Sequence, residues 1–248
     1  MMEQNGLTPV YIEAFDLDDA WFQCLSEILE HGHVYEITRG SYQGQKRLEF
    51  DFATIRIKNP SHQIIPIMPE GSSIPAPTSI EYIHGYLSYL LTGQKTETED
   101  YTYGERLVDA KVRIRDVSGA KELIKEMPLE VNQVEEVIKM YKTQGHGTNQ
   151  AVMEIGMPSD IKLQDPPCLR LIDTRIRYGK LHFFPYFRSW DLWGGFPSNL
   201  GGLELVKQYM AEEIGVENGE IIASSKGLHL YEYSWDLAKQ RTGKLDGC

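Results

Sequence analysis

The chain alternates between stretches of helical spacing and stretches of strand-like alternation. Apolar residues recur every three or four positions in segments that predict five helices: 15–31, 79–92, two within 117–143 (the second at 129–142), and 199–214. In the first segment Trp21, Leu25 and Ile28 share one face behind an acidic first turn. Gly93 and Gly215 follow two of these segments as candidate C-caps.

Alternation of apolar and polar positions predicts the strands, which dominate the second half: 48–57, 151–156, 168–177, 180–189 and 220–233. Tyr178-Gly179 predicts a hairpin between two of them, and Asn218-Gly219 predicts a turn before the last. Four prolines make 62–78 an irregular loop, and the charged segment 94–101 is expected in solvent.

These elements predict an α/β chain, and 248 residues with 41% hydrophobic content suit one domain over 1–248 with a substantial core. No apolar run approaches the roughly 20 residues of a membrane helix. The N-terminal segment does not resemble a secretory signal. Three widely spaced cysteines match neither a disulfide framework nor a zinc site, which favours the reducing cytoplasm and no bound metal.

The net charge of −11 argues against broad binding to nucleic acid or to an anionic membrane. An anionic substrate remains compatible with this charge. It would need a local pocket of arginine side chains and backbone N–H groups within an acidic surface.

The densest chemical signals lie in the second half of the chain. Cys168 follows Asp165, Pro166 and Pro167 at the mouth of a predicted strand, where proline fixes φ and the backbone turns sharply. A buried structural cysteine is the commoner reason for such a residue, because cysteine is among the most buried residue types. A nucleophile is the alternative, and this residue alone leaves both open.

Two polar motifs follow. Arg188 and Ser189 precede a Gly-Gly-x-Pro turn that leads to Asn199, and such a motif can bind phosphate or lower the pKa of a nearby thiol. The simpler interpretation is a loop whose Asn199 caps the next helix. His229 and Tyr231 share one face of a predicted strand and suit sugar hydroxyls, although a core histidine is more common.

Together, the order and spacing of these motifs resemble the thymidylate synthase family. That family carries a Pro-Cys nucleophile, an Arg-Ser-x-Asp-x-x-x-Gly-x-Pro-x-Asn run and a His-x-Tyr pair. This chain carries them as Pro167-Cys168, Arg188 to Asn199, and His229-Leu230-Tyr231. The resemblance is specific over residues 149–235. Upstream, Thr38-Arg39-Gly40 and Tyr103-Gly104 resemble more loosely the family's phosphate-binding turn and its Tyr-Gly pair near the reactive cysteine.

The resemblance implies a layered α/β fold with a large mixed sheet, and a homodimer. It implies methylation of deoxyuridine monophosphate (dUMP) to thymidine monophosphate (dTMP), with 5,10-methylenetetrahydrofolate or a methanopterin-type analogue as one-carbon donor. Cys168 would add to carbon 6 of the pyrimidine beside Tyr103. The other implied contacts are Arg39, Arg188, Ser189, Asn199, His229 and Tyr231 for the nucleotide, and Asp191 and Gly195 for the pterin. Relatives acting on cytosine tend to carry aspartate at Asn199, so asparagine favours uracil.

The chain departs from the family pattern in three places. Thr148-Asn149-Gln150 stands where members usually carry an Arg-Arg pair that binds the partner's phosphate. Tyr86 stands where the alignment expects a catalytic glutamate, and Glu81, about 140° away around the helix, is the candidate instead. The sequence ends 17 residues after Tyr231, which resembles the shorter archaeal-type members and leaves the identity of the pterin open.

Two alternatives follow from these departures. The same scaffold could hydroxymethylate dUMP or dCMP, with water ending the reaction. A catalytically inactive relative could instead bind a nucleotide or RNA as a regulator. The missing Arg-Arg pair favours inactivity, whereas the intact Cys168, Asn199 and His229-Tyr231 set argues against it.

Overall fold

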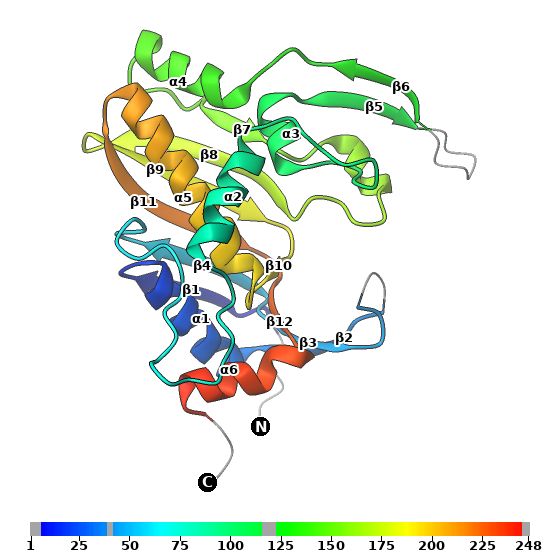
Figure 1. Cartoon of the computed structure of the whole chain (residues 1–248), viewed down its shortest axis with the longest axis vertical. Coiled ribbons are helices and arrows are strands. Elements are labelled where there is room, and N and C mark those ends of the chain that lie inside the picture. The colour runs from blue at the N-terminus through cyan, green and yellow to red at the C-terminus, as the bar shows by residue number, and fades with distance from the viewer. Residues whose placement is uncertain (1–5, 39–41, 116–122, 245–248) are drawn as a thin grey trace.

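The computed structural model describes residues 6–38, 42–115 and 123–244. Its largest element is a six-stranded sheet (Figure 1). In spatial order its strands are β1 (Pro9–Ala14), β4 (Phe52–Ile57), β11 (Glu217–Ser225), β9 (Lys180–Phe187), β8 (Leu169–Arg177) and β7 (Val152–Glu154). The pairs β1–β4 and β9–β11 are parallel and the others are antiparallel, so the sheet is mixed.

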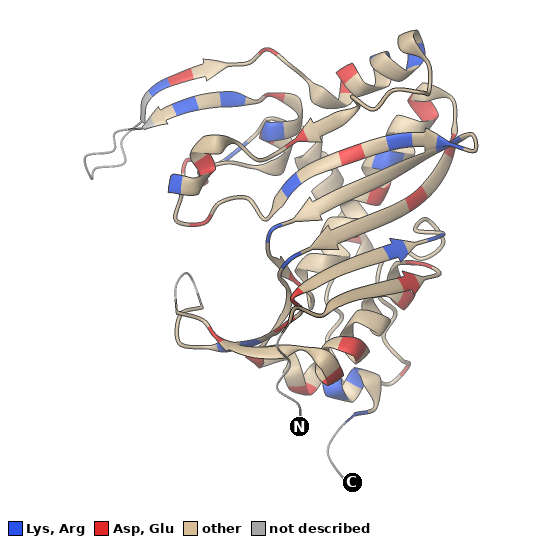
Figure 2. Cartoon of the chain, turned by 180° about the vertical axis from the view of Figure 1, so that it is seen from behind, with Lys and Arg blue, Asp and Glu red and all other residues tan. Residues whose placement is uncertain are grey.

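Helices cover one face of this sheet because alternate strand residues are apolar. On β11, Ile221 and Ala223 are fully buried, whereas Glu220 and Ile222 on the opposite face are partly exposed. The central helix α5 (Gly195–Ile214) packs on β9 and β11, and α1 (Leu17–His31) packs on β1. Two further helices, α2 (Ile80–Leu90) and α4 (Gln133–Gln144), pack against α5. In Figure 2 the other face of the sheet is turned toward the viewer, with the helices behind it.

A smaller sheet lies beside the first and carries part of the candidate site. Its strands are, in order, β10 (Trp190–Asp191), β12 (Leu228–Tyr231), β3 (Lys46–Glu49) and β2 (His33–Glu36). The remaining elements are α3 (Tyr103–Val108), the ribbon of β5 (Lys111–Arg115) and β6 (Leu123–Pro128), the 3₁₀ turns η1 (Pro158–Lys162) and η2 (Glu232–Ser234), and α6 (Trp235–Thr242). None of the helices in the described ranges combines the length and apolarity needed to cross a bilayer.

The predicted fold class, an α/β chain with a large mixed sheet, is confirmed. The hairpin at Tyr178-Gly179 is also present: both residues have positive φ, 54° and 72°, as a two-residue hairpin turn requires, and β8 pairs with β9 on either side. The helices predicted at 15–31, 79–92 and 199–214 correspond to α1, α2 and α5, with α5 starting four residues earlier. The division of the chain into domains stays a prediction.

Several local predictions are wrong. The first helix expected within 117–143 is replaced, where the structure describes it, by β6, which forms a ribbon with β5. The single strands predicted at 48–57 and 220–233 are each divided between the two sheets, as β3 and β4 and as β11 and β12. Helix α2 ends at Leu90 with Leu91 as its C-cap, so Gly93 does not cap it. The sequence patterns also missed the strands β1, β2, β5 and β10, the helices α3 and α6, and the two 3₁₀ turns.

The Asn218-Gly219 turn is wrong for a steric reason. Both residues lie inside β11, at a register shift in its pairing with β9. A Cβ atom on Gly219 would lie 2.5 Å from the carbonyl oxygen of Leu181, so glycine is needed there for the close approach of two strands.

Candidate active site

Cys168 lies directly before β8, where the two central hairpin strands begin to pair. Its carbonyl oxygen accepts a hydrogen bond of 2.8 Å from the backbone N–H of Arg188, which fixes the cysteine opposite the start of the Arg188–Asn199 motif. The Cys168 side chain is partly exposed, whereas Cys24 is fully buried in α1. Of these two cysteines, Cys168 is therefore the one that a substrate can contact.

The Arg188 guanidinium folds back over the two prolines that precede the cysteine. Its Nε donates to the carbonyl oxygens of Pro166 and Pro167, at 3.2 and 3.1 Å, and Nη2 bonds Asp165 Oδ1 at 3.2 Å. Burial raises the pKa of the Cys168 thiol, and the positive charge of Arg188 opposes this rise without cancelling it. Arg188 therefore acts in the predicted direction, but the thiol is protonated at neutral pH in this state.

A buried ion pair holds the loop that carries Cys168. Asp160 of η1 is fully buried, and its two carboxylate oxygens bind Arg106 Nη2 of α3 at 2.8 Å and Arg170 Nη1 of β8 at 3.2 Å. The backbone N–H of Met157 donates to the same carboxylate at 2.7 Å. Because Arg170 also contacts the carbonyl oxygen of Pro167, this cluster ties α3 to the cysteine loop.

Tyr103 approaches the cysteine from the first residue of α3. Its hydroxyl accepts a 3.2 Å hydrogen bond from the backbone N–H of Leu169, the residue after Cys168. Burial, followed by the nearby Cys168, raises the Tyr103 pKa well above its ordinary value, so the phenol stays protonated. Gly104 makes the approach possible, because a Cβ there would lie 2.0 Å from the carbonyl oxygen of Tyr89 in α2.

Asn199 lies in the second turn of α5, where its side-chain amide forms hydrogen bonds with two aromatic side chains. Its Oδ1 accepts from Trp190 Nε1 at 3.1 Å, and its Nδ2 donates to the Tyr86 hydroxyl at 2.9 Å. Trp190 stacks on Phe187 with ring centroids 3.9 Å apart, which fixes the position of the indole N–H. The helix-capping role considered for Asn199 belongs instead to Asp191. The Asp191 carboxylate accepts from the backbone N–H groups of residues 193, 194 and 195 at the start of α5.

His229 and Tyr231 project from one face of β12, as predicted, with ring centroids 4.6 Å apart and nearly perpendicular planes. The Nδ1 atom of His229 lies 2.8 Å from the carbonyl oxygen of Gly227, so Nδ1 carries the proton. Its Nε2 is buried and makes no hydrogen bond to any described residue. Burial lowers the His229 pKa to about 4, so the ring is a neutral acceptor at neutral pH.

A cleft of about 660 Å³ is bounded on one side by Tyr103, whose hydroxyl contacts the peptide after Cys168. Its walls are mainly aromatic: Tyr82, Gly85, Tyr86, Tyr89, Glu99, Tyr101 and Tyr103. Three of the tyrosines form a stack along α2, with centroids 6.1 Å apart from Tyr82 to Tyr86 and 5.8 Å from Tyr86 to Tyr89. A second cavity of about 360 Å³ contains Gly195, Asn199 and Thr78, and the Thr78 hydroxyl is buried with no hydrogen-bond partner among the described residues.

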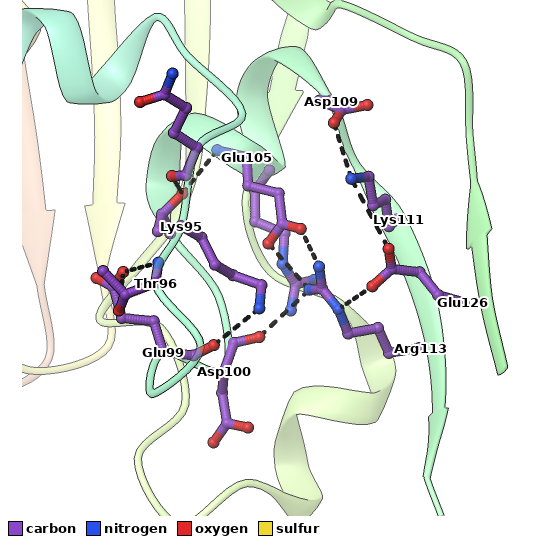
Figure 3. Close-up of polar contacts among 12 residues, drawn as sticks. Lys95, Thr96, Glu99, Asp100, Glu105, Asp109, Lys111, Arg113 and Glu126 are labelled. Carbon is purple, nitrogen blue, oxygen red and sulfur yellow. Dashed lines mark hydrogen bonds and ion pairs between the residues drawn. The ribbon is translucent and has the colours of Figure 1, made fainter. Parts of the chain in front are cut away.

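A polar network fixes the outer wall of the cleft (Figure 3). Glu99 accepts from the backbone N–H and hydroxyl of Thr96 at 2.8 and 3.0 Å, and from Tyr89 at 3.3 Å. Arg113 of β5 bonds the Asp100 carbonyl oxygen at 3.3 Å and pairs with the buried Glu105 of α3. The segment predicted to be solvated at 94–101 is thus anchored to the β5–β6 ribbon.

The structure brings together most of the predicted site residues, but not all. Arg188 and Ser189 lie in the connection between β9 and α5, and Asn199 lies in α5 itself. His229 and Tyr231 lie in β12, which pairs with β10 in that connection. Glu81 lies exposed in the first turn of α2, where it lines neither cavity. Its own backbone N–H and the Ser79 hydroxyl lower the Glu81 pKa, as at a helix N-terminus. Arg39 lies outside the described residues.

The aromatic wall was not predicted, although its residues follow a recognisable spacing. Tyr82, Tyr86 and Tyr89 are spaced four and three residues apart on one helix face, and Tyr101 and Tyr103 follow after one loop. Polar-ended rings at helical spacing usually pack in a core, so this pattern alone did not identify a cleft.

Comparison with known proteins identifies the family. A sequence model described as "Thymidylate synthase" matches residues 92–244. A Methanosarcina mazei protein is 32% identical over 92% of both chains, and a Methanothermobacter thermautotrophicus protein is 27% identical over 92% of this chain and 96% of its own. Both bear the name "Putative thymidylate synthase". A Listeria monocytogenes protein named thymidylate synthase is 30% identical over 46% of this chain and 36% of its own. The chain belongs to the thymidylate synthase family.

Proposed function

We propose that this chain methylates dUMP to dTMP, with Cys168 adding to carbon 6 of the pyrimidine. The observation that carries the proposal is the contact between the Tyr103 hydroxyl and the peptide N–H that follows Cys168. Tyr103 also lines the aromatic cleft, so a cavity large enough for a flat ring is walled by the same side chain that contacts the peptide next to the partly exposed Cys168. Addition of a thiolate at carbon 6 makes carbon 5 nucleophilic, which is the chemistry that methylation needs.

The polar groups around Cys168 suit a nucleotide. The buried Nε2 of His229 is an acceptor without a partner among the described residues, and the sugar hydroxyl of a deoxynucleotide can donate to it. Arg188 Nη1 makes no hydrogen bond within the described part of the chain and, with Ser189, can bind a phosphate oxygen. Arg39 would complete this phosphate site.

The two cavities suit a reduced pterin as the one-carbon donor. The stacked faces of Tyr82 and Tyr86 can pack on a flat ring, and the orphaned Thr78 hydroxyl can bond a ring heteroatom. Gly195 adds no side chain at the wall of the smaller cavity. When bound, the pterin would supply the carbon that becomes the methyl group. Either methylenetetrahydrofolate or a methanopterin-type analogue fits this description.

We also propose that the enzyme is a homodimer in which each subunit contributes to its partner's phosphate site. Arg175 of β8 donates to Asn149 Oδ1 at 3.0 Å, so a cation lies beside the neutral amide that replaces the family's arginine. Arg175 is seven residues beyond Cys168. At about 3.3 Å per strand residue that is roughly 23 Å away, too far to serve the same subunit. Mixing Arg175→Gln subunits with Cys168→Ala subunits tests the idea. If each site needs a partner's arginine, mixed dimers form one site with both residues intact and recover activity that neither parent has.

Intact-protein mass spectrometry with 5-fluoro-dUMP, with and without methylenetetrahydrofolate, tests the main proposal. Wild type should form an adduct, and Cys168→Ala should form none. An adduct that needs methylenetetrahydrofolate identifies the donor, whereas an adduct with nucleotide alone points to another carrier. No adduct with wild type under any condition refutes the proposal. With dUMP as the substrate, the mass of the product then distinguishes dTMP from the hydroxymethyl nucleotide that the alternative reaction would release.

A further inference from the structure

Tyr86 of α2 joins the Asn199 amide to the aromatic cleft. Its ring lies in the stack between Tyr82 and Tyr89 and lines the aromatic cleft. The other side of the ring rests on α5 at Gly202, where a Cβ atom would lie 2.5 Å from the Tyr86 Cδ1. A larger residue at 202 would displace the Tyr86 ring, so glycine at this position allows the ring to pack against α5.

The hydrogen bonds around Asn199 determine which way the Tyr86 hydroxyl donates. The indole N–H of Trp190 can only donate, so the atom of Asn199 facing it must be Oδ1. The other end of the amide, Nδ2, therefore faces Tyr86 and donates to its oxygen. The Tyr86 hydroxyl proton is left over, with no acceptor among the described residues, and is available to a ligand.

The Tyr86 phenol is a neutral donor rather than a base. Burial raises its pKa well above the ordinary value, and the nearby Tyr103 acts in the same direction. The hydroxyl therefore keeps its proton throughout the neutral pH range.

We propose that the Tyr86 hydroxyl donates a hydrogen bond to the oxygen on carbon 4 of the pyrimidine, and thereby selects uracil over cytosine and stabilises the addition intermediate. This inference rests on the proposed function. Asn199 keeps one N–H and one free acceptor site on Oδ1. Together with Tyr86 the site offers two donors and one acceptor, which match the O4 and N3–H of uracil. Cytosine presents an amino group and a bare N3, so the same groups would oppose donor to donor at the amino group and acceptor to acceptor at N3.

The chemistry balances without any proton transfer from Tyr86. The Cys168 thiol first loses its proton to solvent. As the bond between the thiolate sulfur and C6 forms, the C5=C6 electron pair moves toward carbon 4 and the C4=O4 pair moves onto O4, which becomes an enolate oxygen. A donor already aimed at O4 is worth more to this charged state than to the neutral substrate. Tyr86 would therefore act on the rate of addition more than on nucleotide binding.

Tyr86→Phe is the test variant, since it keeps the ring, its stack and its seat on Gly202. We expect the rate of the Cys168 adduct with 5-fluoro-dUMP to fall about 100-fold, as for the loss of one oxyanion donor. The Kd for dUMP should rise by a smaller factor than the rate of adduct formation falls. The ratio of the Kd for dCMP to the Kd for dUMP should decrease about tenfold. Tyr141→Phe is the matched control. It removes a buried hydroxyl bonded at 2.9 Å to Thr174, away from the cleft, and should keep both wild-type values.

The two proposals fail in different ways. A wild type that forms no adduct refutes the proposed function, and the binding ratio measured by calorimetry still tests Tyr86. The inference is overturned if Tyr86→Phe folds and keeps the wild-type ratio of dCMP to dUMP dissociation constants. Where wild type forms the adduct, the variant must also form it at the wild-type rate for this conclusion. If this variant does not fold, 4-thio-dUMP tests the contact on wild type, because sulfur is a weak acceptor. Binding and addition as good as with dUMP would then overturn it.

Discussion

The buried His229 ring predicts a loss of stability in mild acid. Its Nε2 has no partner in the described chain, and protonation would place a positive charge in a site that is 2% exposed. Burial is the largest cause of the lowered His229 pKa, and the nearby Arg47 and Arg188 lower it further. The Gly227 carbonyl oxygen and Asp191 act in the opposite direction but do not outweigh them.

The size and sign of the effect follow from linkage. The His229 pKa falls from 6.5 to about 4 on folding, and at ~1.4 kcal/mol per unit this difference is worth about 3 kcal/mol. Between these two values the unfolded chain binds more protons than the folded one. The free energy of unfolding should therefore fall as pH drops through 6.5, with the full loss reached near pH 4. About 2.5 kcal/mol should be lost by pH 4.5.

Urea unfolding followed by tryptophan fluorescence, at pH 7 and pH 4.5, measures this effect. Because carboxylates and other histidines also titrate there, the quantity of interest is the difference between wild type and His229→Gln. Wild type should lose about 2.5 kcal/mol more than the variant over this interval. His84→Gln, which removes an exposed histidine from α2, is the control for loss of an imidazole. An equal loss in wild type and His229→Gln would show that burial of His229 does not depress its pKa.

Three further predictions follow from contacts around Cys168. Asp160→Asn leaves Arg106 buried without its carboxylate, so urea unfolding should show a loss of about 3–5 kcal/mol, and a loss below about 1 would contradict the burial argument. Cys168 should react with a thiol reagent much faster than Cys24, and bound nucleotide should protect it. The reaction rate of Cys168 should still rise with pH above 8, because burial raises the Cys168 pKa. Equal rates for the two thiols would contradict this. Gly104→Ala should cost about 1–3 kcal/mol, measured as a lower thermal midpoint, because α3 must move away from α2, and an unchanged midpoint would mean that the helices are not in close contact.

The parts of the fold that could be predicted are those in which burial alone decides the pattern. The β8–β9 hairpin was predicted because one face of each strand is buried and Tyr178-Gly179 supports positive φ. Where tertiary packing overrides local preference, prediction failed. Asn218-Gly219 has strong turn propensity, yet it continues β11 because Gly219 permits the close approach of Leu181.

The site was predictable in its motifs and not in its contacts. Cys168, Asn199 and His229 were proposed as site residues because the order and spacing of their motifs resemble a known family, and their roles stay predictions. The bond between Tyr86 and Asn199 joins residues 113 positions apart, and no local pattern encodes such a contact. The same is true of Arg175 and Asn149, which meet only because β7 and β8 are paired.

In the proposed reaction, the aromatic wall would change how the developing charge is balanced. Glu99 is the one carboxylate among the described residues lining the larger cleft, and Thr96 and Tyr89 already occupy its oxygens. Addition of a thiolate places negative charge on the pyrimidine, and a nearby carboxylate would oppose that charge unless it first gained a proton. Neutral phenols whose pKa values are raised by burial, as at Tyr86 and Tyr103, offer donors without this conflict. A tyrosine at the expected glutamate position is thus compatible with catalysis in a chain of net charge −11.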